Sequence, residues 1–155
     1  MGASPVRRIL VATDFSDSAT EALEWTITVA RGCGAEISLL HVVDLASTWI
    51  PLSGPAVFPA PVPPEVVEQV EQLASTSLDA TGRDVPEITQ RIVRTGHARE
   101  VIPATAQEIG ADVIVVASHG RRGVSQLFIG SVAEHVVRHS VVPVLVVRSR
   151  GRAAV

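Results

Sequence analysis

Residues Asp112-Val113-Ile114-Val115-Val116 form an apolar run of strand length, and the sequence around them decides the fold. An unbroken run of Val and Ile is typical of a strand that is buried on both faces, as in a parallel sheet. Residues 96–109 before the run and residues 131–138 after it are predicted to be helical. A buried strand between two helices predicts a parallel α/β architecture.

The same alternation continues toward both ends of the chain. Further strands are predicted at residues 8–13, 36–43, 88–94 and 143–147, and further helices begin near Ser18 and Pro64. The strand at 88–94 is less apolar than the others, so we expect it nearer an edge of the sheet. The order β-α-β-α-β-α-β-α-β predicts an α/β, single-domain, doubly wound, five-stranded parallel sheet with helices on both faces, a Rossmann-like fold with right-handed crossovers.

Local signals mark several helix ends. Ser18 with Glu21, and Ser131 with Glu134, have the spacing of a capping box, in which each side chain satisfies a backbone amide at the helix start. We therefore expect one helix to begin at Ser18 and another at Ser131. The glycines of residues 32–34 are expected to end the first of these helices.

Residues 44–64 contain six prolines and have no stable period, which predicts a long surface loop. The following helix is expected to begin near Pro64, because proline suits the first turn of a helix. Its predicted apolar stripe consists of Val66, Val70, Leu73 and Ala74. Pro103 is expected to kink or delay the helix of residues 96–109.

Size and composition limit the classes of function. The 155 residues fit one domain, 1–155, and 46% of them are apolar. A net charge of −3 argues against a broad basic face for nucleic acid. Cys33 is the only cysteine, so an internal disulfide and a zinc cluster built around it are both excluded. Without an apolar run of about 20 residues there is no predicted membrane span. These features predict a cytoplasmic protein.

Two predicted strands end in polar residues. In open parallel sheets, ligands bind beyond the carboxyl ends of strands, where the strand order reverses. The first strand ends in Ala12-Thr13-Asp14, and the fourth ends in Val116-Ala117-Ser118-His119-Gly120. Gly120 allows backbone amides to approach an anion, and Gly130-Ser131 opens a helix whose first amides attract one. The guanidinium groups of Arg121 and Arg122 are suited to charge-assisted hydrogen bonds with phosphate oxygens. Together with the amides and the Ser131 hydroxyl, they predict that residues 117–131 hold nucleotide phosphates.

Other interpretations of these residues stay open. Glycines between a strand and a helix are common punctuation, and Ser131 is also explained as a helix cap. The segment lacks the glycine-lysine order of a P-loop and the Gly-x-Gly-x-x-Gly of a dinucleotide-binding fold. His119 is better explained by packing or hydrogen bonding than by general-base catalysis. The remaining histidines are too scattered in sequence to predict a metal site.

The chain resembles the universal stress proteins. Nucleotide-binding members of that family carry Gly-x-x-Gly, nine residues, and then Gly-Ser or Gly-Thr after the fourth strand. Here Gly120 is followed by nine residues and Gly130-Ser131, while Ala117 stands at the first family glycine. Five further matching stretches are Ile9–Ser16, Leu39–Val43, Val93–Gly96, Ala111–Val116 and Pro143–Val147. The resemblance covers nearly the whole chain outside the Pro-rich loop.

The resemblance implies an ATP site, with Mg²⁺ as a further expectation. It implies that Asp14 contacts the ribose, that Val42 meets the adenine through backbone groups, and that glycines and Ser131 hold the phosphates. The full set of expected site residues is Ala12, Thr13, Asp14, Val42, Val116, Ala117, Ser118, His119, Gly120, Arg121, Arg122, Gly123, Gly130, Ser131 and Val132. If the position of Ala117 requires a positive φ, alanine costs about 1–2 kcal/mol there. The strand character of residues 116–118 favours an extended conformation, which alanine adopts freely.

The family also implies function and assembly. The leading hypothesis is an ATP-binding stress-response regulatory protein that acts through nucleotide-dependent conformation or partner binding. The alternatives are a slow ATP hydrolase and an interaction module of the same fold that binds no nucleotide. No clear acid–base pair is present, so the chain is not expected to be an efficient enzyme. Residues 144–147 are apolar on both faces, which predicts a homodimer through the C-terminal strand, and neither nucleic acid nor a membrane is expected as a partner.

Overall fold

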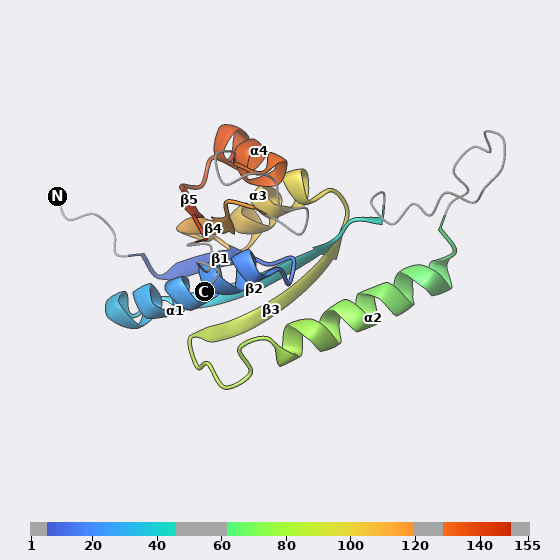
Figure 1. Cartoon of the computed structure of the whole chain (residues 1–155), viewed down its shortest axis with the longest axis horizontal. Helices are drawn as coiled ribbons and strands as arrows, with labels where there is room; N and C mark the ends of the chain where they lie inside the picture. The colour runs from blue at the N-terminus through green and yellow to red at the C-terminus, as the bar shows by residue number, and fades with distance from the viewer. Residues whose placement is uncertain (1–5, 46–61, 120–128, 150–155) are drawn as a thin grey trace, which may run out of the picture.

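The computed structural model describes residues 6–45, 62–119 and 129–149, in which strands and helices alternate (Figure 1). The strands are β1 (Arg8–Ala12), β2 (Glu36–Val43), β3 (Ile88–Thr95), β4 (Val113–Ala117) and β5 (Val144–Val147). The helices are α1 (Asp17–Cys33), α2 (Pro64–Ala80), α3 (Ala98–Glu108) and α4 (Ser131–His139). The predicted order of elements is confirmed.

The strands form one parallel sheet in the order β3-β2-β1-β4-β5. The predicted doubly wound fold is therefore confirmed, and the less apolar strand β3 lies at an edge as expected. The other edge is β5, which pairs with β4 from Ile114 opposite Val144 to Ala117 opposite Val147. Strand β4 lies inside the sheet between β1 and β5.

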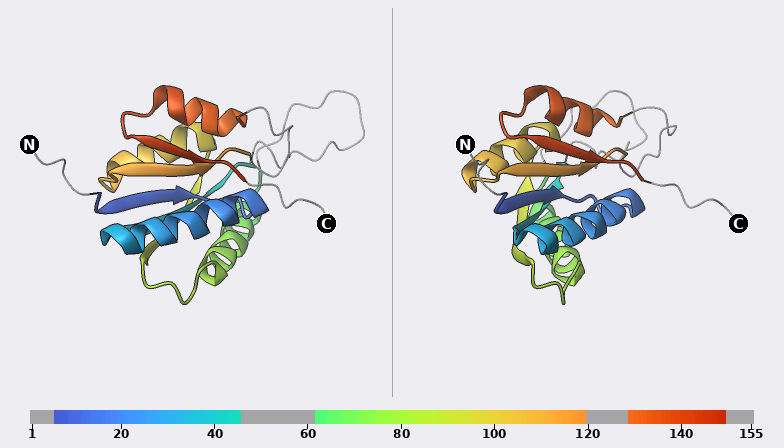
Figure 2. Two further views of the ribbon diagram at one scale, coloured as in Figure 1. Left: turned by 60° about the vertical axis from the view of Figure 1, so that its left-hand side comes forward. Right: turned by 90° about the vertical axis from the view of Figure 1, so that its left-hand side faces the viewer.

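Alternate residues of each strand enter two separate cores, because successive side chains of a strand point to opposite faces. Ile9 and Val11 of β1 pack under α1 and α2, whereas Leu10 between them packs under α3 and α4. Figure 2 shows the sheet between these two helical layers. All three side chains are buried, and each contributes about 1.5–3 kcal/mol from removal of its surface from water.

The N-cap of helix α1 lies two residues before the residue that the capping-box pattern predicts. Ser16 has extended backbone angles, and its Oγ accepts a hydrogen bond from the amide of Ala19 at 3.2 Å. Ser18 lies inside the helix, so its prediction as the cap is wrong. The helix ends at Gly34, whose φ of +70° is the left-handed conformation that glycine adopts at low cost. Gly32 is still helical.

The second predicted capping box is also wrong. Helix α4 is capped by Gly130 in an extended conformation, and the cap makes no side-chain hydrogen bond. Ser131 is the first helical residue, and the carboxylate of Glu134 pairs with Arg138 at 2.9 Å instead of reaching back to the helix start. The favourable i,i+4 ion pair along the helix surface competes with the box for Glu134.

Helix α2 begins at Pro64 as predicted, but its buried face differs from the predicted stripe. Ala74 and Leu78 are buried, whereas Val66 and Leu73 are exposed. The helix packs mainly on β3 and β2 at the edge of the sheet, so only a narrow side of it is covered. Residues 46–61 of the predicted Pro-rich loop lie outside the described residues, and Pro64 belongs to the helix instead of the loop.

Helix α3 contains Pro103 in its interior, with the ring buried.

At the amino ends of the strands, Asp112 joins β4 to the start of β1. Its Oδ2 accepts hydrogen bonds from the backbone amides of Arg7 at 2.8 Å and Arg8 at 2.9 Å. These two bonds stabilise the carboxylate and hold the pKa of Asp112 below its ordinary value.

Over the described stretches of the chain, none of the helices has the length and apolar character required to cross a membrane.

Candidate functional site

The strand order reverses between β1 and β4. From β1 the chain proceeds to β2 and β3 on one side, and it then returns to place β4 and β5 on the other. Such a reversal leaves a crevice at the carboxyl ends of the two central strands, where ligands bind in this class of sheet. Val11 pairs with Val115, and Asp14 and Ser118 each follow that pair by three residues. The two polar strand ends singled out in the sequence are therefore neighbours.

The turn after β1 holds Asp14 in a defined position. Thr13 is buried and donates its amide to the carbonyl of Leu40 at 2.8 Å, which extends the sheet by one residue. The Asp14 carboxylate accepts the amide of Ser16 at 3.0 Å, and the Thr13 hydroxyl accepts the amide of Phe15 at 3.1 Å. Asp14 is half-buried just beyond the carboxyl end of β1, and its carboxylate lies in the turn that leads into α1.

Phe15 adopts a strained backbone conformation in this turn. Its φ of +62° is the one positive φ of a non-glycine residue in the part of the chain that the structure describes. For a bulky residue this conformation costs about 1–2 kcal/mol and persists only when the surroundings enforce it. The backbone of the Asp14 turn is thus held in place against a local preference.

His41 of β2 supplies the contacts that enforce the turn. Its Nδ1 lies 2.8 Å from the carbonyl oxygen of Thr13, and its ring packs on Phe15 with centroids 4.4 Å apart. Because a carbonyl only accepts hydrogen bonds, Nδ1 carries the proton. Sequence reasoning missed His41 as a site residue, since only the pairing of β1 with β2 brings it under the turn. Val42, the next residue, is half-buried and packs against the core below α3 and α4.

The end of β4 is joined to the start of α4 through Ser118. Its side chain is buried, its amide donates to Val147 of β5 at 2.8 Å, and its carbonyl accepts the amide of Gly130 at 2.6 Å. The Ser118 hydroxyl lies 2.8 Å from Nδ1 of His119, so a hydrogen-bonding role accounts for this histidine. These bonds fix the N-terminus of α4 at the carboxyl edge of the sheet.

The N-terminus of α4 is suited to bind an anion. The first backbone hydrogen bond of the helix runs from the amide of Glu134 to the carbonyl of Gly130, at 2.9 Å. The amides of Ser131, Val132 and Ala133 precede this bond, and the first amides of a helix have no partner within it. Ser131 is exposed and its hydroxyl is not used as a cap. The amides and the positive end of the helix dipole together attract phosphate groups.

Ala117 is the last residue of β4, in an extended conformation without a positive φ. The penalty of a left-handed alanine therefore does not arise, as expected from the strand character of residues 116–118. Val116 is buried near the end of β4, and Ala12, the last residue of β1, is partly buried and packs against the same core.

The predictions on Gly120, Arg121, Arg122 and Gly123 lie outside the described residues. Across the described ranges, no group of three or more His, Cys, Asp and Glu side chains is arranged to hold a metal ion.

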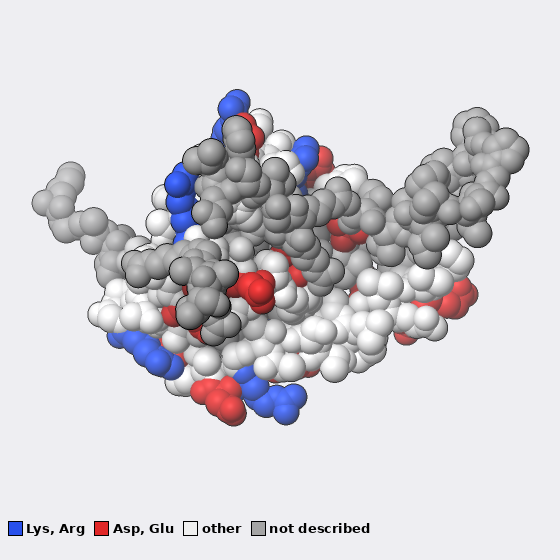
Figure 3. All heavy atoms as spheres, in the orientation of Figure 1, with Lys and Arg blue, Asp and Glu red and all other residues white. Residues whose placement is uncertain are grey.

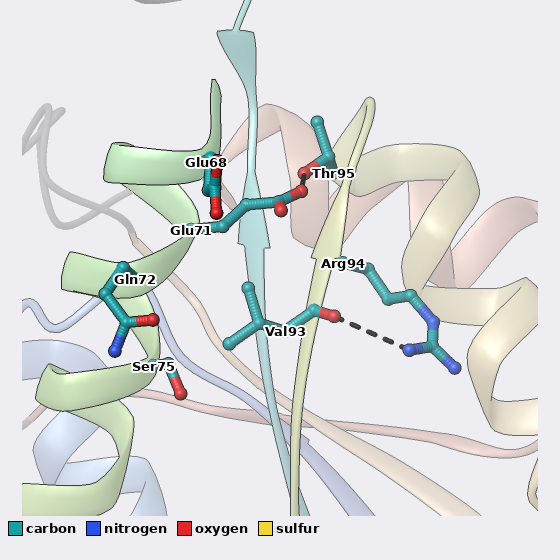
Figure 4. A pocket seen from close by; sticks show the side chains of 7 residues that line it. All are labelled: Glu68, Glu71, Gln72, Ser75, Val93, Arg94 and Thr95. Atoms are coloured by element: carbon teal, nitrogen blue, oxygen red, sulfur yellow. Dashed lines mark hydrogen bonds between the residues drawn. The ribbon is translucent and has the colours of Figure 1, made fainter. Parts of the chain in front are cut away.

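A shallow hollow of about 390 Å³ lies between α2 and β3, away from the switch point (Figure 4). It is lined by Glu68, Glu71, Gln72, Ser75, Val93, Arg94 and Thr95. The Thr95 hydroxyl donates to the Glu71 carboxylate, while Arg94 points away from the glutamates and pairs with Glu108 of α3 at 3.1 Å. Figure 3 shows acidic side chains gathered where α2 begins. The negative lining disfavours phosphate, so we do not assign the nucleotide site to this hollow.

The fold and the switch-point edge define a doubly wound α/β protein in which the N-terminus of a helix lies beside an acidic turn. Comparison with known families agrees with this class, because the sequence pattern of the universal stress protein family matches residues 5–148. The chain belongs to the universal stress protein family.

Relatives match along nearly their whole length. Universal stress protein YxiE of Bacillus subtilis is 31% identical over 91% of this chain and 98% of its own. Universal stress protein MJ0577 of Methanocaldococcus jannaschii is 26% identical over 93% of this chain and 96% of its own. The solved MJ0577 structure superposes with a TM-score of 0.76 at 25% identity, covering 95% of this chain and 99% of that one.

A structure from Arabidopsis thaliana, At3g01520 with AMP bound, superposes with a TM-score of 0.59 at 20% identity and covers 94% of this chain and 93% of its own. At that level of identity the likeness concerns the fold alone.

Proposed function

We propose that this protein binds ATP or a related adenine nucleotide at the β1–β4 switch point and acts as a stress-response regulator. Binding would change its conformation or its contacts with a partner protein, in the cytoplasm, without engaging nucleic acid or a membrane. A relative of the same family and fold has been solved with AMP bound, which supports an adenine nucleotide as the ligand.

One observation carries the proposal most directly. The 2.6 Å hydrogen bond from the Gly130 amide to the Ser118 carbonyl holds the N-terminus of α4 beside the end of β4, next to the turn that holds Asp14. An anion-binding helix start and a carboxylate on adjacent strands match the two ends of a nucleotide, because phosphates require donors and ribose hydroxyls require acceptors.

The residue roles follow from this arrangement. Asp14 would accept hydrogen bonds from the ribose, and the backbone of Val42 would face the adenine. The amides of Ser131 and Val132, with the Ser131 hydroxyl, would bind phosphate oxygens. Gly120 would add backbone amides, and Arg121, Arg122 and Gly123 complete the proposed phosphate loop. Mg²⁺ would accompany ATP through the phosphate oxygens, as is usual for an ion that retains much of its water.

Isothermal titration of nucleotide-stripped protein with ATP, ADP and AMP tests the proposal. We expect saturable binding that Asp14→Asn weakens about tenfold or more, since a hydrogen bond to a charged group is worth about 1.5–3 kcal/mol. Asp17→Asn is the matched control, because Asp17 is an exposed acid of the first turn of α1 that faces no proposed ligand group. No heat from any of the nucleotides at millimolar concentration would refute the proposal and favour an interaction module that binds no nucleotide.

Release of ADP from bound ATP, followed by chromatography, separates a regulatory binder from a slow hydrolase. A regulator that only binds the nucleotide leaves ATP intact during a long incubation, whereas a hydrolase converts ATP to ADP. Nucleotide that copurifies with the protein would identify the adenine nucleotide held in the cell.

We also propose that the protein forms a homodimer through β5. This strand lies at the sheet edge, Val144, Val146 and Val147 are half-buried, and Leu145 is exposed. The Val147 carbonyl bonds to β4, so the alternate residues Val144 and Val146 direct their backbone groups outward. Light scattering at micromolar concentration should report a dimer, and Val146→Pro should yield monomer by removing one outward amide. A monomeric native protein would refute this assembly.

A further inference from the structure

Two histidines that lie about one helical turn apart meet on the surface of α4. His135 and His139 are four residues apart, the spacing that places two side chains on one face of a helix. Their rings stack with centroids 4.0 Å apart and planes inclined by 22°. His135 is half-buried and His139 is exposed, so the edges of the paired rings are reachable from solvent.

A backbone contact sets the tautomer of one ring. Nδ1 of His139 lies 2.9 Å from the carbonyl oxygen of His135. A carbonyl accepts only, so Nδ1 carries the proton and Nε2 of the neutral ring holds the lone pair. A ring nitrogen that donates to a backbone carbonyl is the usual support of a metal-ligating histidine, because it fixes the tautomer and raises the basicity of the other nitrogen.

The position on the helix favours a bound cation. His139 is the last residue of α4, where the unpaired carbonyls create a partial negative charge. The neighbouring cation, Arg138, is paired with Glu134 at 2.9 Å, which offsets its repulsion of an incoming ion. In a chelate with bonds of about 2.0 Å the two ligating nitrogens lie roughly 3–4 Å apart. The rings are stacked with centroids 4.0 Å apart, so one ring must rotate about its side-chain bonds to turn both lone pairs toward one ion.

We propose that His135 and His139 form a bidentate surface site for a divalent late transition-metal ion, with Cu²⁺ bound more tightly than Ni²⁺ or Zn²⁺. Imidazole nitrogen suits these ions, and their affinities follow the order Ni²⁺ < Cu²⁺ > Zn²⁺. Mg²⁺ and Ca²⁺ prefer oxygen ligands and are excluded. Water completes the coordination, since in the described part of the chain no third His, Cys, Asp or Glu joins the pair.

The site is separate from the proposed nucleotide site. Ser131 begins α4 and His139 ends it, so the two ligands would occupy opposite ends of the same helix. A metal ion bridging residues 135 and 139 would staple the last turn of α4, directly before the connection to β5. Failure of nucleotide binding would therefore leave the proposed metal site unaffected, and the two proposals are tested separately.

Titration of the full chain, purified without a histidine tag and freed of metal by a chelator, tests the site. The probes are Cu²⁺, Ni²⁺, Zn²⁺ and Mg²⁺ as chlorides, measured by calorimetry and, for Cu²⁺, by electron paramagnetic resonance. We expect one Cu²⁺ per chain with nitrogen hyperfine coupling and no binding of Mg²⁺. His135→Asn and His139→Asn should each weaken Cu²⁺ binding about a hundredfold, because loss of either ligand removes the gain from chelation.

The double variant should lose less affinity than the product of the two single losses, which is the signature of a chelate. His97→Asn is the matched control, since His97 is an exposed histidine on a different element. Far-UV circular dichroism verifies that α4 stays folded in every variant. Affinity within twofold of the native chain in both single variants, or an equal loss in His97→Asn, would overturn the proposal.

Discussion

The His41→Leu substitution provides the sharpest test of how the acidic turn is built. In the native protein the His41 ring donates a hydrogen bond to the Thr13 carbonyl at 2.8 Å and packs against Phe15. Leucine has a side chain of similar size but removes both the hydrogen-bond donor and the aromatic contact. The turn would then lose the contacts that hold Phe15 in its left-handed conformation.

The magnitude follows from these contacts. The hydrogen bond contributes about 0.5–1.5 kcal/mol and the aromatic contact about 0.5–1.5 kcal/mol. Their sum, about 1–3 kcal/mol, matches or exceeds the cost of about 1–2 kcal/mol for the left-handed Phe15. His41→Leu should therefore lower the free energy of unfolding by about 1–3 kcal/mol. For a chain of this size each kcal/mol corresponds to about 2–4 °C in melting temperature.

Urea denaturation followed by circular dichroism measures the effect, and two companion variants separate its parts. His41→Asn retains a donor near the position of Nδ1 and should recover the hydrogen-bond share of the loss. Phe15→Gly removes the strain, but it also removes the aromatic contact and the packing of the Phe15 side chain on the core, so it should lower the stability. Full native stability in His41→Leu would refute the reasoning, as would equal losses in His41→Leu and His41→Asn. A nucleotide titration of His41→Leu should also show weakened binding, because the turn that holds Asp14 is released.

Three further predictions concern helix ends and pH. Gly34→Ala should destabilise the protein by about 1–2 kcal/mol because the φ of Gly34 is +70°, whereas the helical Gly32→Ala should stabilise it by about 0.5–1 kcal/mol. Neither added Cβ meets another atom within 4 Å, so a thermal melt measures the backbone effect alone, and equal shifts in the two variants would contradict the prediction. Ser16→Ala should lower the free energy of unfolding, measured in urea, by about 1 kcal/mol because it removes the α1 cap, while Ser18→Ala should change it little. A larger loss in Ser18→Ala than in Ser16→Ala would show that Ser18 is the cap. Asp112 has a lowered pKa in the folded protein, so its contribution to stability is present above its ordinary pKa of 3.8 and is lost as the pH falls below that value. Asp112→Asn should therefore reduce the loss of unfolding free energy at acid pH, and an unchanged dependence of that free energy on pH would exclude this role.

Local sequence patterns predicted most of the fold. The apolar runs of β1 and β4, with helices between them, predicted a doubly wound sheet because burial on both faces demands cover on both faces. The glycines and Ser131 predicted a helix start, which the structure places at Ser131; anion binding there stays a prediction. The exact caps were less predictable: Ser16 and Ser18 both suit a helix start, and only the backbone angles of the folded turn select Ser16.

Tertiary structure decided which distant residues meet. The pairing of β1 with β2 brings His41 under the strained Phe15, and the pairing of β1 with β4 brings Asp14 near Ser118. The edge position of α2 leaves Leu73 exposed although its spacing predicts burial. Sequence by itself determined the elements, because hydrophobic periodicity is set by residues within a few positions of each other. Strand order depends on contacts between segments far apart in the chain, so the assembly of the candidate site was decided only by the folded structure.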